Sequence, residues 1–290
     1  VHPSPAVLKI IQDKLVQKQF LADNDIPTSP FEAVEEPTME QFAGFGFPLV
    51  QKARRGGYDG RGVAVMKSAE DFAKHLPVPS LIEGFVPAEK EIAVMVARNG
   101  SGEVKCFPPV EMRVHPGENL LDVLLAPADI NDEVAAKAAA IAIRTVEALD
   151  GVGIFGVEMF ATTEGEILIN EIAPRTHNSG HHTIEANATD QFEQHLRAIL
   201  NLPLGSTETL SPAAMVNLLG APGEAGKPVL RGLPEALAIP GVYLHMYGKA
   251  TTSPFRKMGH ITILDNDLAS AHAKAMQVRN TIQIGSEDDT

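Results

Sequence analysis

The spacing of strand-like and helix-like segments is the feature of this sequence that most restricts its fold. Strand patterns, several of them joined by short turns, occur at 47–52, 62–67, 80–86, 91–97, 153–161 and 166–172. Capping residues and helical periodicity predict helices at 5–22, 68–76, 131–149, 190–201 and 268–281. Because these segments do not alternate with the regular spacing of βαβ units, the pattern indicates an α+β fold.

Composition narrows the class of protein. The 290 residues are 44% hydrophobic and 21% charged, which is enough apolar material for a real core, and no run of eighteen apolar residues occurs. The formal charge of −13 argues against broad nucleic-acid binding, so anionic ligands must be met by local clusters of Arg and Lys. The single cysteine, Cys106, excludes an internal disulfide and a cysteine-based zinc cluster. We therefore expect a cytoplasmic protein with no secretory signal and no membrane partner.

Two glutamates on a predicted hairpin carry the first chemistry. If residues 164–165 form a two-residue turn, Glu158 lies directly opposite Glu171 and on the same face. Two carboxylates forced together need a cation between them, and oxygen ligands, with the amide of Asn170 nearby, suit Mg²⁺ bound to phosphates. The alternative is a wrong register that leaves both glutamates in solvent. It is disfavoured by the apolar neighbours expected on their face, namely Ile154, Phe160, Ile167 and Ile169.

A glycine-rich segment, residues 52–62, connects two of the strands and is called the flap below. It holds four glycines within seven positions and the cations Lys52, Arg54, Arg55 and Arg61. Backbone amides in such a segment can close on a phosphate, although the segment matches neither the Walker pattern nor the dinucleotide fingerprint. The alternative is a flexible hairpin tip with solvated arginines. The density of positive charge in an acidic chain favours a phosphate-covering flap.

A polar segment rich in Arg and His follows Glu171 directly. Its three histidines, His177, His181 and His182, leave a zinc site as a minor alternative, but no cysteine is near and Arg175 adds a repelling charge. Arg175 as an anion clamp and His177 as a donor or acid–base group are better supported, against the alternative of a purely structural loop. A second cationic cluster, taken alone more typical of a surface, contains Lys249 and Arg256.

Together these segments resemble a known family. Its motifs occur here in order at 12–14, 52–62, 156–158, 170–181 and 256–260, and the resemblance covers nearly the whole chain. The sequence looks like the ATP-grasp enzyme N5-carboxyaminoimidazole ribonucleotide synthase of purine biosynthesis. The resemblance implies two α+β lobes that clasp ATP, followed by a β-rich C-terminal portion. The expected division is a linker helix at 1–22, a small lobe at 23–88, a large lobe with the Mg site at 89–205 and the β-rich portion at 206–290.

The resemblance also implies a reaction. ATP phosphorylates bicarbonate to carboxyphosphate, and the exocyclic amine of aminoimidazole ribonucleotide captures the carboxyl group. Glu158 and Glu171 would hold Mg²⁺, while Lys14 and Lys52 would contact the ATP phosphates. Adenine, ribose and phosphates would be met further by Gly56, Gly57, Glu83, the backbone of Phe85 and Val86, Glu91 and Asn170.

The substrate residues implied by the resemblance lie in three segments. Arg175 and His177 would position bicarbonate and carboxyphosphate, with Lys249 as a further catalytic group. The ribonucleotide would be met by Tyr58, Arg61, Lys249 and Arg256. Family members are commonly homodimers, and they carry a dinucleotide-fold-like domain before the first helix that we expect this chain to lack. The alternatives are another ATP-grasp ligase, such as the formate-using glycinamide ribonucleotide transformylase, and a nucleotide-binding fragment that does not turn over.

Overall fold

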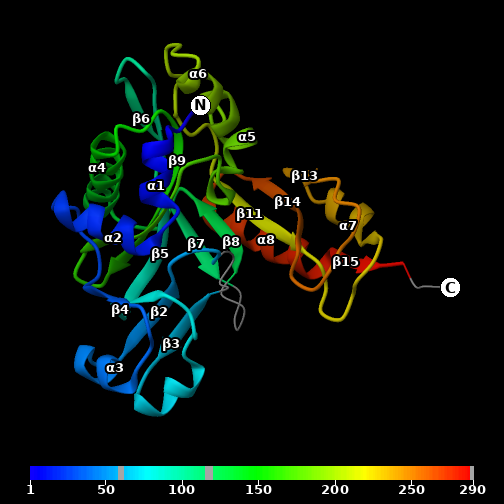
Figure 1. Cartoon of the computed structure of the whole chain (residues 1–290). Coiled ribbons are helices and arrows are strands. Elements are labelled where there is room, and N and C mark those ends of the chain that lie inside the picture. The colour runs from blue at the N-terminus through cyan, green and yellow to red at the C-terminus, as the bar shows by residue number, and fades with distance from the viewer. Residues whose placement is uncertain (58–61, 115–119, 288–290) are drawn as a thin grey trace.

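The computed structural model describes residues 1–57, 62–114 and 120–287 (Figure 1). It confirms an α+β fold of mixed helices and antiparallel sheets. The chain begins with helices α1 (Pro5–Ile11) and α2 (Lys14–Asp23), where one continuous helix was predicted. Asp13 is extended and its carboxylate accepts hydrogen bonds from the first amides of α2, so it caps a new helix and breaks the predicted one. Ser4 caps α1 as expected.

A four-stranded antiparallel sheet forms the small lobe, at the bottom of Figure 1. Its strands, in spatial order, are β1 (Phe31–Val34), β4 (Ser80–Gly84), β2 (Leu49–Ala53) and β3 (Val63–Met66). A small core that includes Phe42, Leu49 and Ile82 joins this sheet to α3 (Met39–Phe45) and the 3₁₀ helix η1 (Ala69–Lys74). The flap connects β2 to β3, and its residues 58–61 lie outside the described part of the chain.

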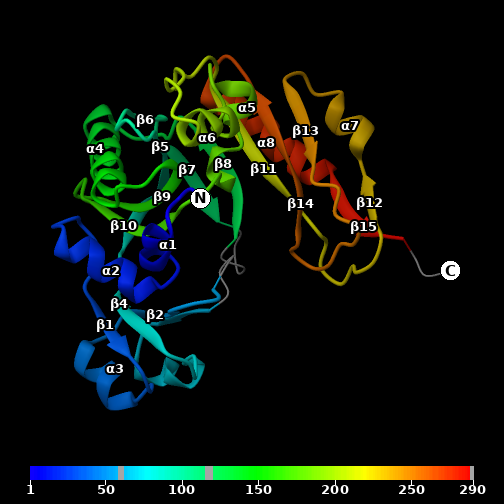
Figure 2. The same ribbon diagram turned by 45° about the horizontal axis from the view of Figure 1, so that its top comes forward.

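A nine-stranded antiparallel sheet is the largest of the three sheets that the described residues form (Figure 2). Eight strands follow one another in the order β10 (Ile167–Ala173), β9 (Gly153–Thr162), β5 (Ala88–Arg98), β7 (Val110–Val114), β8 (Leu121–Ala126), β11 (Ala213–Leu219), β14 (Lys257–Leu264) and β13 (Val242–Met246), and β6 (Val104–Cys106) pairs with β5. Residues from beyond position 206 therefore continue the sheet that begins at β5. The β8–β11 pairing, which sets Val123 opposite Val216, makes this connection.

Helices cover the large sheet. The helix α4 (Asp132–Ala148), capped by Asn131 as predicted, packs with α1 and α2 over β5, β9 and β10. The helix α6 (Gln191–Ile199) contacts β9 and β5, and α8 (Leu268–Thr281), with the predicted bounds, packs on β11 and β14. The remaining elements are η2 (Asn178–Gly180), α5 (Thr183–Ala186), β12 (Pro228–Arg231), α7 (Leu233–Leu237) and β15 (Gln283–Ser286). Among the described residues, no helix combines the length and the apolar character needed to cross a membrane.

The β9–β10 hairpin reaches the predicted pairing by a different route. Its turn has three residues, 163–165, with Gly165 at φ 74° and its amide bonded to the carbonyl of Thr162 at 3.0 Å. The predicted two-residue turn is therefore wrong. A β-bulge between Ile169 and Glu171 shifts the register back by one residue, which sets Glu158 opposite Glu171 after all.

The same bulge corrects the predicted neighbours of the two glutamates. Ile167 and Ile169 pack in the core with Val157 and Met159, on the opposite face from the glutamates. Phe160 does share a cavity with Glu158, as predicted. Before the bulge, Ile167 and Ile169 point into the core. After the bulge, Glu171 points to the opposite face of the sheet, toward the cavity.

Candidate active site

The facing glutamates lie at a cavity between the two sheets. This cavity has a volume of about 1070 Å³ and is lined from both sides. The small lobe contributes Lys52 from β2 and Glu83 from β4, and the hairpin contributes Glu158, Asn170 and Glu171. The structure therefore brings together the predicted metal ligands and most of the predicted ATP residues, which also include Lys14, Gly57, Phe85, Val86 and Glu91.

Negative charge is concentrated at the large-sheet side of this cavity. Burial, together with the neighbouring carboxylates of Glu171 and Glu91, raises the pKa of Glu158 to about 7, although 27% of its side chain remains exposed. Burial also raises the pKa of Glu91, against the opposing charge of Lys52. Carboxylates crowded in this way favour a bound cation.

Two lysines lie beside the carboxylate pair. Lys14, the first residue of α2, forms an ion pair with Glu171. Lys52 forms an ion pair with Glu83 and donates a hydrogen bond of 2.7 Å to Oδ1 of Asn170, the bulge residue. Asp13 interrupts the predicted continuous helix, and α2 starts directly after it at Lys14. This interruption places Lys14 beside the hairpin.

The carboxylate of Glu83 is buried and is shared by two ammonium groups. Oε1 meets Lys52 and Oε2 lies 2.7 Å from Nζ of Lys18, whose side chain is only 4% exposed. Burial alone would raise the pKa of Glu83, but the charges of Lys52 and Lys18 outweigh it and lower this pKa to about 2. Both carboxylate oxygens are thus engaged by lysines.

Arg175 and His177 follow β10 and face the same cavity. The backbone of His177 exchanges two hydrogen bonds with the Gln191 side chain, of 2.8 and 2.9 Å. Nδ1 of His177 lies 2.7 Å from Oγ of Ser179 and accepts from the amide of Ser179 at 3.4 Å. Nε2 lies 3.4 Å from Oε1 of Glu158, which joins the Arg/His segment to the carboxylate pair.

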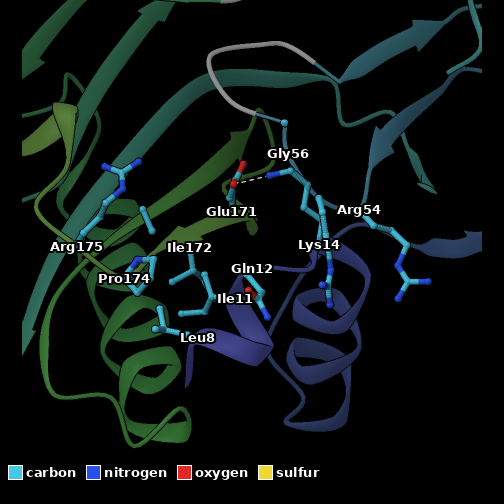
Figure 3. A pocket seen from close by; sticks show the side chains of 13 residues that line it. Leu8, Ile11, Gln12, Lys14, Arg54, Gly56, Glu171, Ile172, Pro174 and Arg175 are labelled. Atoms are coloured by element: carbon cyan, nitrogen blue, oxygen red, sulfur yellow. Dashed lines mark ion pairs between the residues drawn. The ribbon is translucent and has the colours of Figure 1, made fainter. Parts of the chain in front are cut away.

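A smaller cavity of about 240 Å³ opens beside the root of the flap (Figure 3). Lys14 and Glu171 face each other at its wall, with Arg54 on one side and Arg175 on the other. Gly56 and Gly57 also line it, as expected for the flap. Asp13 anchors the flap root, because its buried carboxylate lies 2.9 Å from Arg54 and 3.3 Å from Arg55.

The cationic cluster near the C-terminus is only partly at the site. Arg256 donates to the carbonyl and the hydroxyl of Thr251, each at 2.8 Å, and Lys249 donates to the carbonyl of Lys257. The cavity wall itself is reached by Lys257. Neither Lys249 nor Arg256 is among the described residues that line the two cavities. The predicted substrate residues Tyr58 and Arg61 lie outside the described residues.

Sequence reasoning placed Lys257 in the second cationic cluster without giving it a role of its own, and it missed Lys18 and the capping role of Asp13. Asp13 and Lys257 lie inside the quoted motifs, and a short acidic residue before a helical run is a recognisable capping signal. Lys18 gave no signal, because a lysine on an amphipathic helix is normally solvated. Its partner Glu83 lies on a strand of the small lobe, far along the sequence.

The carboxylates and histidines of the site are the available metal donors. Among the described residues no group of three or more His, Cys, Asp or Glu is placed to hold one. His181 stacks on His260 with ring centroids 4.6 Å apart, so its nitrogens do not converge with those of His177 on a zinc ion. The pair Glu158 and Glu171 remains, and its facing carboxylate oxygens fit a hard divalent cation that takes its other ligands from phosphate and water.

Two sheets that enclose a cavity, with Lys52 from the smaller sheet, Lys14 from α2 and the paired carboxylates from the larger sheet, are the arrangement of an ATP-grasp protein. The ATP-grasp domain family matches residues 19–192. A second family, described as the phosphoribosylaminoimidazole carboxylase C-terminal domain, matches residues 213–274.

Individual relatives narrow the class further. The chain is 42% identical to the N5-carboxyaminoimidazole ribonucleotide synthase of Synechococcus elongatus, over 97% of this chain and 72% of that protein. It is 41% identical to the phosphoribosylaminoimidazole carboxylase of Saccharomyces cerevisiae, over 94% of this chain and 50% of that protein. The chain belongs to the N5-carboxyaminoimidazole ribonucleotide synthase family.

Solved structures agree with this assignment. The synthetase from Thermotoga maritima superimposes with a TM-score of 0.91 at 53% identity, covering 99% of this chain and 76% of that one. The synthase from Aspergillus clavatus, solved in complex with ADP and 5-aminoimidazole ribonucleotide, gives a TM-score of 0.87 at 33% identity and covers 96% of this chain and 75% of that one. The chain therefore spans about three quarters of these structures and half of the yeast relative.

Proposed function

We propose that this chain catalyses the ATP-dependent carboxylation of 5-aminoimidazole ribonucleotide by bicarbonate, giving N5-carboxyaminoimidazole ribonucleotide, ADP and phosphate. The observation that carries the proposal is the placement of Glu158 and Glu171 opposite each other, with Lys14 and Lys52 beside them and Arg175 on the same strand end. Phosphoryl transfer needs this combination, because positive charge must surround the phosphates while acidic oxygens hold the divalent cation.

The first step joins bicarbonate to phosphate. A bicarbonate oxygen forms a bond to the γ-phosphorus, and the bond from that phosphorus to the ADP oxygen breaks. Lys14 and Lys52 would orient the phosphates, and Glu158 and Glu171 would hold Mg²⁺, which neutralises phosphate charge when bound. The Arg175 guanidinium would clamp bicarbonate by charge-assisted hydrogen bonds, and the His177 ring, held by Ser179 and Gln191, would fix the position of bicarbonate beside Glu158.

The second step transfers the carboxyl group. The exocyclic amine attacks the carbonyl carbon of carboxyphosphate, the new C–N bond forms, and the C–O bond to phosphate breaks as the amine loses a proton. We place the ribonucleotide near Tyr58, Arg61, Lys249 and Arg256 by family resemblance, and add Lys257 because it reaches the cavity wall. The adenine would lie along the backbone of Phe85 and Val86, which lines the cavity together with Glu91 and Gly57.

The assay follows ADP release with 5-aminoimidazole ribonucleotide present, in bicarbonate-free buffer to which bicarbonate or formate is added back. We expect ADP release to depend on bicarbonate and not on formate. Release driven by formate would instead indicate a formate-using ligase, and ATP binding without turnover would indicate a nucleotide-binding protein. The same resemblance supports a cytoplasmic homodimer, which sedimentation of the purified protein would test.

A further inference from the structure

A second buried lysine lies behind the ATP-facing lysine of the cavity. Lys18 is on α2, and its Nζ lies 2.6 Å from Oγ1 of Thr28, 2.9 Å from Oγ of Ser29 and 2.7 Å from Oε2 of Glu83. Its side chain is 4% exposed and that of Glu83 is 3% exposed. An ammonium group at this depth needs a specific reason, because burial of a lysine is costly unless it is paired.

The groups around Nζ of Lys18 accept hydrogen bonds from it. The Thr28 hydroxyl donates to the carbonyl of Ile169 at 2.8 Å, and the Ser29 hydroxyl donates to Glu83 at 3.0 Å. Each hydroxyl has therefore used its only hydrogen and can only accept from Lys18. Nζ of Lys18 therefore lies among acceptors and beside the Glu83 carboxylate, whose charge opposes the lowering of the Lys18 pKa by burial.

The Lys18 ammonium joins three parts of the fold. It lies on α2, it pairs with Glu83 on β4 of the small lobe, and it lies 3.5 Å from the carbonyl of Ile169 on β10 of the large sheet. Ile169 directly precedes Asn170, which accepts from Lys52. Lys18 therefore holds the Glu83 carboxylate at a fixed place relative to the hairpin that carries Glu171.

Lys18 and Lys52 differ in what they can reach. Both pair with Glu83, one at each carboxylate oxygen, but Lys52 lines the large cavity and Lys18 is enclosed by protein groups. When a phosphate enters the cavity, Lys52 can exchange the carboxylate for a phosphate oxygen. Glu83 then keeps Lys18, so no buried carboxylate is left without a partner.

We propose that Lys18 is a positioning residue, the permanent counter-ion of Glu83, which leaves the Lys52 ammonium available to the phosphates of ATP. The proposal rests on the proposed function only in that Lys52 contacts ATP phosphate. Without Lys18, Lys52 would be the only cation among the described residues paired with the buried Glu83 carboxylate, and a phosphate would have to compete with Glu83 for Lys52. ATP affinity would then fall although Lys18 itself does not touch ATP.

The test measures binding of the Mg²⁺ complex of a non-hydrolysable ATP analogue by calorimetry, for Lys18→Met and for the exposed control Lys9→Met. We expect Lys18→Met to weaken binding by at least about tenfold, the cost of disturbing a buried charge pair. Lys9→Met should bind like the unmodified chain. If Lys18→Met also binds like the control, the proposal is overturned.

A second pair of variants separates charge compensation from packing. In the Glu83→Gln background no carboxylate needs a counter-ion, so adding Lys18→Met should change the affinity by no more than about twofold. Glu83→Gln leaves the Lys18 amine with Thr28 and Ser29 as hydrogen-bond partners, and neither this variant nor the double variant contains an unpaired buried carboxylate, so the pair keeps the test valid if Lys18→Met alone does not fold. A loss of tenfold or more in this background would overturn the proposal, because Lys18 would then act through Thr28 and Ser29. Failure of bicarbonate-dependent turnover would refute the proposed function but leave this binding series decisive for Lys18.

Discussion

Replacement of Glu158 by glutamine should stabilise the metal-free protein at alkaline pH. The pKa of Glu158 rises from its ordinary 4.5 to about 7 in the folded chain, because burial and the carboxylates of Glu171 and Glu91 disfavour its charge. Between pH 4.5 and 7 the folded state therefore holds a proton that the unfolded state has lost, and stability falls as the pH rises. A shift of this size at about 1.4 kcal/mol per unit removes about 3 kcal/mol of unfolding free energy.

The assay is urea unfolding of the unmodified chain and Glu158→Gln at pH values from 5 to 8, with divalent cations removed by a chelator. We expect the difference in unfolding free energy between the two proteins to move in favour of the variant by about 2 to 3 kcal/mol across this range. Groups titrating elsewhere, such as His181, whose pKa burial lowers to about 4, affect both proteins alike and cancel. If the difference in unfolding free energy between the two proteins does not change with pH, the raised pKa of Glu158 and its cause, the neighbouring carboxylates, would be refuted.

Three further variants test the site. Glu171→Ala should abolish Mg·ATP turnover with an unchanged circular dichroism spectrum, and normal turnover would disprove its place in the metal site. Arg175→Ala should lower kcat/KM for bicarbonate by about a hundredfold or more; a loss confined to the melting temperature would show that this arginine is only structural. Gly156→Ala would place a Cβ 2.8 Å from Cβ and Cγ of His177, so it should displace the ring and reduce turnover. The control Gly44→Ala meets no atom within 4 Å, and equal activity of the two alanine variants would contradict the assigned position of His177.

Local signals in the sequence predict the longer helices α4, α6 and α8 and the strands β2, β3, β4, β5, β9 and β10, but not α3, β1, β7 or β8. Asn131 and Asp190 each cap a helix at the predicted place, since their side chains accept from the first free amides. The same rule applies to Asp13, where it produces a break that apolar periodicity along 5–22 conceals. Periodicity describes which face is buried, but a cap decides where a helix begins.

Pairing across the hairpin was harder to predict. The position of Glu158 opposite Glu171 depends on a turn of three residues and a bulge at Asn170, two irregularities that cancel in register. Neither the turn length nor the bulge has a sequence signal as strong as that of a helix cap. As a result, the sequence predicts Ile167 and Ile169 on the face of the glutamates, whereas they lie on the opposite face. The buried pair of Lys18 and Glu83 could not be predicted from local sequence patterns, because it depends on tertiary packing between α2 and the small lobe.

In the mechanism proposed above, bicarbonate is activated by phosphorylation at the Glu158–Glu171 site. The most direct measurement supplies ¹⁸O-labelled bicarbonate together with ATP and 5-aminoimidazole ribonucleotide, and determines the isotope content of the inorganic phosphate released. A bicarbonate oxygen forms the bond to phosphorus and stays on the phosphate when the carboxyl group is transferred to the amine. We therefore expect one ¹⁸O atom in each phosphate released. Phosphate that carries no label, released at the same rate, would contradict it.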